Sequence, residues 1–206
     1  MYLIVGLGNP ESEYSGTRHN MGFDVVNLVV KQLDLGFFNY DKRVDAEMIR
    51  AKVFGNDCIF LKPQTYMNLS GDSIRRVVNY YRIPEENIIV IYDDMDTEKS
   101  QIRIRKNGGS AGHNGVKSVL AVLDNFIRVR VGIGRCLSID ERTKIDYVTA
   151  KISDEEKAIL REGVVKAADA VIDMLKEDID IVMNKHNVRE KSENEVTKSE
   201  ENMEEN

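Results

Sequence analysis

Apolar positions along this chain follow two different spacings, and the chain alternates between them. Short β-branched runs bounded by turn residues predict strands, and these lie at 2–7, 46–54, 57–62, 87–92, 101–105 and 127–133. Apolar residues spaced by three or four positions predict helices, and these lie at 20–34, 70–82, 113–124 and 153 to about 184. This alternation predicts an α/β fold: a single domain with a twisted, mostly parallel mixed sheet flanked by helices.

Local signals support this assignment. Residues 55–57 (Gly-Asn-Asp) are turn formers between two of the strand runs and predict a hairpin. Residues 153–156 (Ser-Asp-Glu-Glu) have the capping-box pattern that begins a helix. The run 87–92 is apolar throughout, as expected for a central strand. Because sites in such folds form in loops at the carboxyl ends of strands, the polar residues there are the candidates for chemistry.

A histidine and an acidic run follow two of the predicted strands. His19 lies in a polar stretch where a neutral imidazole can act as a base, although a lone histidine can equally cap or pad the next helix. Asp93 directly follows the strand 87–92 and can orient a histidine and stabilise its protonated form. Asp93, Asp94 and Asp96 together are a second candidate, a site for a divalent cation. No serine or cysteine stands in a G-x-S-x-G context, which favours a base-activated water as nucleophile.

Two further clusters are rich in amide and glycine residues. Residues 64–71 (QTYMNLSG) offer amide groups to a ligand, although Asn68 or Ser70 can also cap a helix. Residues 108–115 (GGSAGHNG) precede a predicted helix, where backbone N–H groups can meet phosphate. No G-K-[ST] follows as in a P-loop. Within this stretch, His113 is interpreted as structural rather than catalytic.

Charge is distributed unevenly along the chain. The net charge is −6, of which residues 187–206, with seven glutamates and three basic residues, carry −4. This segment has no periodic apolar pattern, so we predict a disordered acidic tail after a folded domain at 1–186. Between Lys99 and Arg135, eight basic residues face Asp124 alone, a local balance of +7. This balance favours a surface that binds an anionic ligand over an ordinary solvated one.

The composition excludes several classes of protein. The chain has 206 residues, 42% of them hydrophobic, and can therefore bury a sizeable core. No apolar run approaches the ~20 residues of a membrane span. The apolar run 2–7 lacks a basic lead-in, so we expect no signal peptide and a cytoplasmic protein. Two cysteines cannot build a disulfide framework, and three histidines lack the spacing of a structural zinc site.

Taken together and in this order, the clusters resemble the bacterial-type peptidyl-tRNA hydrolase family. The matching segments are VGLGNP (5–10), Tyr14 with TRHNMG (17–22), KPQTYMNLSG (62–71), DDMD (93–96), GGSAGHNGVKS (108–118) and RVRVGIGR (128–135). They are distributed over about two thirds of the chain, and the acidic tail after about residue 187 lies outside the resemblance.

The resemblance implies a monomeric cytoplasmic enzyme without metal or organic cofactor. Such an enzyme cleaves the ester between a peptide and the 3′ ribose of tRNA, and so recycles tRNA from prematurely released peptidyl-tRNA. By motif, His19 is the expected general base, Asp93 the residue that holds its imidazole, and Asn9 the residue that discriminates a blocked amino group from a free one. The residues expected to bind the 3′ end and the peptide are Tyr14, Tyr66, Asn68 and Asn114, with Met67 packed nearby. Arg105 and Arg130 match the basic pair that meets the 5′-phosphate region of tRNA.

Three departures from the family pattern affect local geometry. Glu11 replaces the glycine that usually follows Asn-Pro, residues 97–101 lack the usual proline and glycine, and Cys136 stands where proline is usual. None of them removes a chemical group from the expected site.

Two other functions stay open at this point. An RNA-binding relative would keep the fold and the basic surface without catalysis, although the retention of His19 and Asp93 argues against it. A metal-dependent hydrolase would instead use the acidic run at 93–96.

Overall fold

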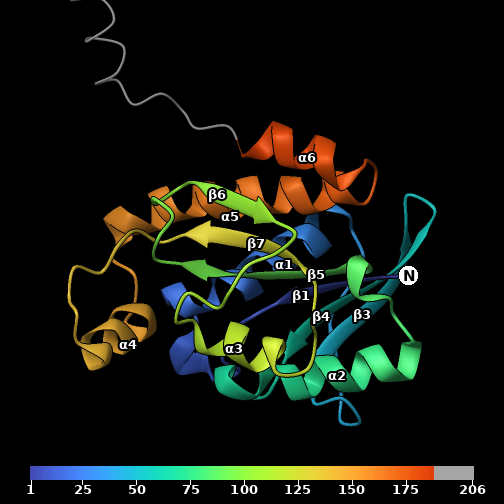
Figure 1. Ribbon diagram of the computed structural model, residues 1–206, viewed down its shortest axis with the longest axis horizontal. Coiled ribbons are helices and arrows are strands. Elements are labelled where there is room, and N and C mark those ends of the chain that lie inside the picture. Colours follow the sequence, from blue (N-terminus) through green and yellow to red (C-terminus); the bar gives the residue numbers. More distant parts are fainter. Residues whose placement is uncertain (188–206) are drawn as a thin grey trace, which may run out of the picture.

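The fold is built on one mixed sheet. A computed structural model describes residues 1–187, so that residues 188–206 of the predicted tail lie outside the described residues. A seven-stranded sheet with the order β2-β3-β4-β1-β5-β7-β6 forms its centre (Figure 1). The strands are β1 (Tyr2–Gly6), β2 (Asn39–Asp41), β3 (Ala46–Val53), β4 (Asn56–Pro63), β5 (Ile88–Asp94), β6 (Ile102–Arg105) and β7 (Ile127–Gly132).

The four central strands, β4-β1-β5-β7, run parallel. The edges are antiparallel, because β2 pairs with β3, β3 with β4, and β6 with β7 in that sense. The β3–β4 hairpin turns at Phe54 and Gly55, whose φ angles of 47° and 85° suit a two-residue type I′ turn. All residues of β5 are buried, as its uniformly apolar sequence predicts. The predicted single-domain α/β class with a mixed sheet is confirmed, and the parallel pairings lie in its centre.

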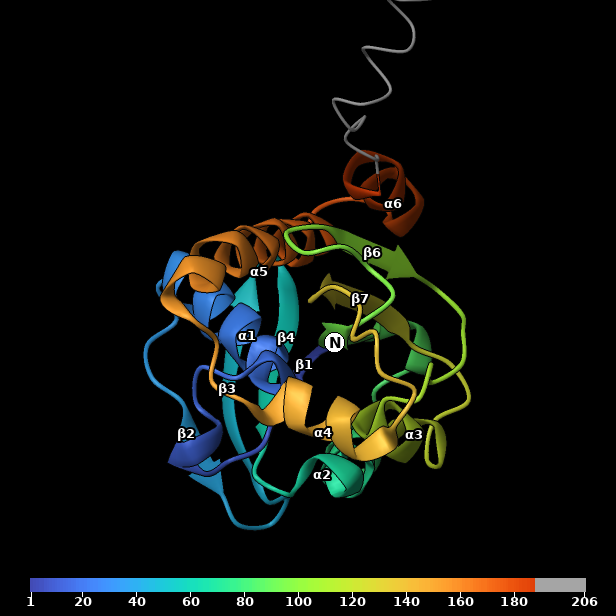
Figure 2. The ribbon, with the colours of Figure 1, turned by 90° about the vertical axis from the view of Figure 1, so that its left-hand side faces the viewer.

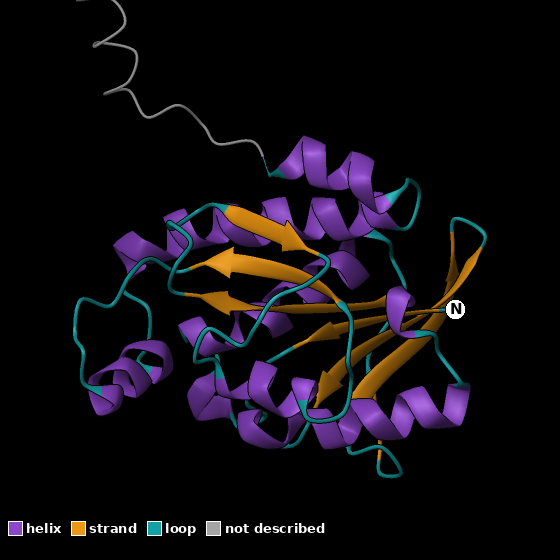
Figure 3. Ribbon diagram, viewed as in Figure 1, coloured by secondary structure: helices purple, strands orange, loops and turns teal. Residues whose placement is uncertain are grey.

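Helices cover both faces of this sheet (Figure 3). The α-helices are α1 (Met21–Gln32), α2 (Ser70–Tyr81), α3 (Asn114–Leu120), α4 (Glu141–Thr149), α5 (Asp154–Met174) and α6 (Ile179–His186), and the 3-10 helices are η1 (Ser12–Tyr14), η2 (Arg18–Asn20), η3 (Met67–Leu69) and η4 (Glu85–Asn87). α1 and α5 pack on one face, and α2 and α3 on the other. α4 lies between α1 and α3 at the end of the sheet (Figure 2). None of the helices within residues 1–187 is long and apolar enough to span a membrane.

The predicted helix from 153 to about 184 is wrong in extent, because residues 175–178 separate α5 from α6. The Asp178 carboxylate accepts a first-turn backbone N–H of α6 at 2.8 Å and so caps a new helix. The Asp173 carboxylate of α5 pairs with His186 Nε2 at 2.9 Å, which holds α6 back against α5. Such polar contacts leave no signal in the spacing of apolar residues.

One strand and one α-helix, like the short 3-10 helices, were not predicted from the sequence. β2 has three residues, none of them buried, and α4 has nine residues with Val148 alone buried. Both elements bury too little apolar surface to produce a periodic pattern. α4 matters nevertheless, because it closes one side of the cleft described below.

The start of α1 approaches the sheet closely at Gly22. A Cβ atom at this position would lie 2.4 Å from the carbonyl oxygen of Ile91 and 2.4 Å from the backbone nitrogen of Leu7. Both neighbours are backbone atoms of the sheet or its first loop, so they cannot rotate away as a side chain would. The missing side chain therefore lets α1 approach β1 and β5, and η2, with His19, lies against β5.

We expect Gly22→Ala to destabilise the fold by about 3 kcal/mol, because the new methyl group overpacks backbone atoms. For a chain of this size, that loss corresponds to a Tm lower by about 10 °C. Gly109→Ala is the matched control, since a Cβ there meets nothing within 4 Å. Thermal unfolding of the three proteins checks the prediction, and equal Tm values for both variants would contradict it.

Candidate active site

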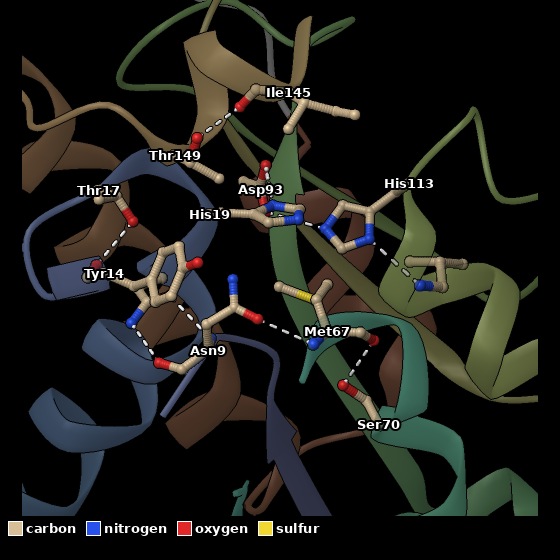
Figure 4. A network of polar contacts seen from close by, with 12 residues as sticks. Asn9, Tyr14, Thr17, His19, Met67, Ser70, Asp93, His113, Ile145 and Thr149 are labelled. Carbon is tan, nitrogen blue, oxygen red and sulfur yellow. Dashed lines mark hydrogen bonds and ion pairs between the residues drawn. The ribbon is translucent and has the colours of Figure 1, made fainter. Parts of the chain in front are cut away.

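The buried carboxylate of Asp93 lies at the centre of the site (Figure 4). It follows the apolar part of β5 and accepts hydrogen bonds from two histidines of distant segments. Its Oδ1 atom lies 2.9 Å from His19 Nδ1 and 2.9 Å from His113 Nε2. Burial alone would raise the pKa of Asp93, but the charge and hydrogen bonds of both imidazoles outweigh burial and hold this pKa well below its usual range. Asp93 is therefore a carboxylate at neutral pH.

His19 is held by η2, just before α1, and only 9% of its surface is exposed. Because Nδ1 faces Asp93, the other ring nitrogen, Nε2, is left for the cleft that His19 lines. Burial lowers the pKa of His19, but the charge and hydrogen bond of Asp93 outweigh it and raise the pKa above 6.5. The two residues that the sequence analysis paired are thus in direct hydrogen-bond contact.

His113 caps a helix and also contacts Asp93. Its Nδ1 accepts the backbone N–H of Val116 at 3.2 Å and caps α3. Since Nδ1 is an acceptor, the ring proton lies on Nε2, which donates to Asp93. The two imidazole centroids are 4.8 Å apart. The sequence showed a polar helix start at this position but could not show the contact with Asp93.

Asn9 is fixed on three sides. Its Oδ1 accepts the N–H of Met67 at 2.9 Å, and its backbone N–H and carbonyl pair with the side-chain amide of Asn20 at 2.9 and 3.0 Å. These bonds join the loops after β1 and β4. They also fix the amide orientation, so that Nδ2, which has no partner within residues 1–187, lies on the His19 side of the amide (Figure 4).

These residues surround one cleft of about 400 Å³. Of the residues predicted for the site, the following line it: Asn9, His19, Tyr66, Met67, Asn68, Asp93 and Asn114. α4 supplies much of the remaining wall, including Ile145 and Val148. Tyr14 is not part of this lining; it lies on η1, where its carbonyl accepts the Thr17 hydroxyl at 2.7 Å.

The departure at Glu11 connects two loops of the site. The Glu11 carboxylate accepts a hydrogen bond from the hydroxyl of Tyr66, which is 50% exposed. This contact joins the loops after β1 and β4 at a second point beyond Asn9. Glu11 therefore changes what Tyr66 contacts and leaves the bonds of Asn9 in place.

Arg18, next to His19, connects the base to the α4 wall, and the sequence analysis did not single it out. Its guanidinium donates to the carbonyl of Tyr147 at 3.0 Å and lies 4.2 Å from that ring's centroid. It also forms an ion pair with Glu156 of α5. The available signal was an arginine adjacent to a candidate catalytic histidine.

The predicted phosphate-binding arginines share one face of β6 and β7 but are not directly opposite each other. Arg130 pairs in register with Arg103, and Arg105 with Arg128. Arg130 Nη2 lies 2.7 Å from Asp94 Oδ1, whereas Arg105 is exposed. Buried Arg128 instead donates to backbone carbonyls, including that of Gly108 at 2.6 Å, and so supports the glycine-rich loop.

Asp93 and Asp94 point to opposite faces of β5. Asp93 meets the two histidines, while Asp94 meets Arg130 and the hydroxyl of Thr97. Within residues 1–187, the group whose ligand atoms could converge on a cation is therefore His19, Asp93 and His113, all within 4.8 Å of one another, rather than the acids at 93–96.

The fold and the site define a hydrolase with an α/β fold, in which a histidine–aspartate pair opens into an amide-lined cleft and no serine or cysteine within residues 1–187 hydrogen-bonds to the histidine. The sequence model of the peptidyl-tRNA hydrolase family matches residues 3–195. The chain belongs to this family. The match extends past residue 187, where the resemblance was expected to end.

Relatives and solved structures agree with this assignment. A peptidyl-tRNA hydrolase of Clostridium botulinum (strain Alaska E43) is 46% identical over 91% of this chain and 96% of its own length. That of Thermoanaerobacter sp. (strain X514) is 45% identical over 91% of this chain and its full length. The crystal structure of peptidyl-tRNA hydrolase from Acinetobacter baumannii superposes with a TM-score of 0.85 at 33% identity, and covers 93% of this chain and 97% of its own.

The hydrogen bonds predict two different neutral tautomers. At a pH well above the ordinary histidine pKa, we expect the proton of His19 on Nδ1 and that of His113 on Nε2, because these atoms donate to Asp93. Long-range ¹H–¹⁵N spectra of the full chain distinguish the two forms. A proton on Nε2 of His19 would contradict the arrangement.

Proposed function

We propose that the protein hydrolyses the ester between a peptide, or an N-blocked aminoacyl group, and the 3′ ribose of tRNA. The observation that carries the proposal is the bond of 2.9 Å between His19 Nδ1 and Asp93, which leaves Nε2 free to act as a base in the cleft. Membership of the family supports the reaction class. The physiological result is the recycling of tRNA from prematurely released peptidyl-tRNA.

His19 Nε2 removes a proton from water, and the resulting hydroxide attacks the ester carbonyl carbon. Asp93 stabilises the imidazolium that forms, because its carboxylate remains charged next to Nδ1–H. When the tetrahedral intermediate collapses, the C–O bond to the ribose breaks and Nε2–H protonates the leaving 3′ oxygen. The products are a free peptide acid and tRNA, and the base returns to its neutral form.

Asn9 supplies selectivity for a blocked amino group. Met67 holds its Oδ1, so Nδ2 presents a hydrogen-bond donor to the cleft. A blocked amino group carries a carbonyl oxygen, which accepts such a bond, whereas a free ammonium group offers donors only. The fixed amide therefore favours peptidyl-tRNA over aminoacyl-tRNA.

The remaining contacts divide between the tRNA 3′ end, the peptide and the phosphates. Asn68 and Asn114 are exposed amides from opposite loops of the cleft and are suited to ribose and peptide groups, and Met67 packs beneath them. Tyr66 and Tyr14 extend the binding surface along the loop after β1. Arg105 and Arg130 bind phosphate in the 5′ region, with Arg130 oriented by Asp94.

The proposal includes a monomer in the cytoplasm that works without metal or organic cofactor. The second function considered, RNA binding without catalysis, would not require a buried carboxylate to orient His19. The geometry around Asp93 favours the enzyme.

His19→Ala should reduce hydrolysis of an N-blocked aminoacyl-tRNA by roughly 10²–10⁴-fold, because the general base is lost. Affinity for the substrate should change little. His186→Ala is the matched control, since His186 pairs with Asp173 on α5, away from the cleft. Release of tRNA is followed with and without EDTA and with an unblocked substrate. Tight binding without cleavage by the wild type would instead establish an RNA-binding protein.

The pH profile should depend on Asp93. A base must be neutral, so kcat/KM should fall as pH decreases through the pKa of His19, which lies above 6.5. In Asp93→Asn, the charge that raised this pKa is gone while burial still lowers it, so the acidic midpoint should move to lower pH. The plateau rate should drop by about 10²-fold or more.

Asp173→Asn provides the control, because it removes the carboxylate that pairs with His186, away from the cleft. It should leave both midpoint and plateau unchanged. An unshifted midpoint in Asp93→Asn would show that Asp93 does not set the pKa of the catalytic base.

A further inference from the structure

The last described residue is tied to the outer edge of the sheet. The side-chain amide of Asn187 pairs with the backbone of Ile104 on β6: the Ile104 N–H donates to Asn187 Oδ1 at 2.7 Å, and Asn187 Nδ2 donates to the Ile104 carbonyl at 3.1 Å. The Asn187 side chain thus hydrogen-bonds to the backbone N–H and C=O groups of an edge strand, as a neighbouring strand would. The chain after Asn187 therefore starts from β6.

The two residues on either side of Ile104 are cations without an acidic partner. Arg103 and Arg105 form no ion pair with any residue in 1–187, and Arg105 contacts only its neighbour's carbonyl oxygen. Other cations of the same region are neutralised by acids from elsewhere in the chain. These pairs are Lys99 with Glu156, Lys106 with Asp180, Arg130 with Asp94 and Arg135 with Asp96.

The segment that follows Asn187 carries the opposite charge. Residues 188–206 contain seven glutamates against three basic residues, a net charge of −4. The glutamates are Glu190, Glu193, Glu195, Glu200, Glu201, Glu204 and Glu205. An acidic segment therefore follows Asn187 in the sequence, and Asn187 is bound at Ile104, between two arginines that have no acidic partner within residues 1–187.

The length of this segment is sufficient to reach them. Glu193 and Glu195 lie six and eight residues after Asn187, a span of up to ~20–26 Å in an extended chain. Neighbouring strands are only ~5 Å apart, so this span covers the β6–β7 face. A tether this short gives an effective concentration on the order of millimolar, which makes even weak ion pairs form often.

We propose that the acidic segment 188–206 docks on the face of Arg103 and Arg105 and competes there with the phosphates of tRNA. This inference rests on the proposed function, which assigns the same face to tRNA phosphates. The competition weakens the binding of nucleic acids that are held by phosphate contacts alone. It weakens the binding of a peptidyl-tRNA less, because the cleft also holds its 3′ end and its peptide. The tail thus acts as an internal competitor that favours the complete substrate over other RNA.

The test neutralises the tail in the full-length chain with the substitutions Glu193→Gln, Glu195→Gln, Glu200→Gln and Glu201→Gln. At low salt, KM for an N-blocked aminoacyl-tRNA should fall about 3- to 10-fold, because the competitor is weakened, while kcat stays unchanged. At high salt the difference should disappear. An unchanged KM at low salt, or an altered kcat, would overturn the proposal.

A matched variant controls for net charge. It carries Asp57→Asn, Glu86→Gln, Glu162→Gln and Glu177→Gln, which remove the same charge from exposed positions outside β6 and β7. Its KM should change much less than that of the tail variant. In a background with Arg103→Gln and Arg105→Gln, neutralising the tail should have no effect, and an undiminished effect there would place the tail elsewhere.

A binding readout separates this inference from the proposed function. Amide NMR shifts of residues 103–106 in the full chain should differ between the wild-type and neutralised tails at low salt only. If no variant cleaves the substrate but these shifts appear, the proposed function fails and the docking stands. Shifts that depend on protein concentration would indicate docking between two copies and would overturn the intramolecular contact.

Discussion

The buried carboxylate of Asp93 is the constraint on which the site depends. A charge inside a protein is costly unless hydrogen bonds compensate it, and here His19 and His113 provide them at 2.9 Å each. Both histidines must therefore be held in place, one by η2 before α1 and the other by the N-terminus of α3. The same bonds that stabilise the carboxylate orient both imidazole rings. The burial of this charge and the geometry of the cleft are consequently linked through Asp93.

The parallel centre of the sheet brings the rest of the cleft to this carboxylate. β1, β4 and β5 are parallel neighbours, so the loops that follow them meet at one edge. Asn9 and Met67 join two of these loops by a bond of 2.9 Å, and this bond fixes the orientation of the Asn9 amide. Arg18, next to His19, connects η2 to α4. Hydrogen bonds between loops in this way hold the walls of the cleft together.

The charge available on the β6–β7 face depends on ion pairs formed in the three-dimensional fold rather than on the local sequence. The window from Lys99 to Arg135 is strongly basic, yet acids from distant segments, such as Asp180 and Glu156, neutralise part of it. Arg103 and Arg105 keep their charge available. These two cations of β6 lie next to Asn187, whose side chain hydrogen-bonds to Ile104 between them.

The sequence by itself predicted the α/β class and most of the strands and helices, and it placed the polar residues His19, Asp93 and Asn9 close to the ends of predicted strands, because apolar spacing and polar residues at strand ends are local properties. Only the tertiary structure decided what depends on contacts between distant segments. This second group contains four features: the contact of His113 with Asp93, the hydrogen bond that fixes the Asn9 amide, the break between α5 and α6, and the pairing of Arg130 with Asp94. Each joins residues whose separation along the chain carries no signal, since side-chain hydrogen bonds and ion pairs have no sequence period.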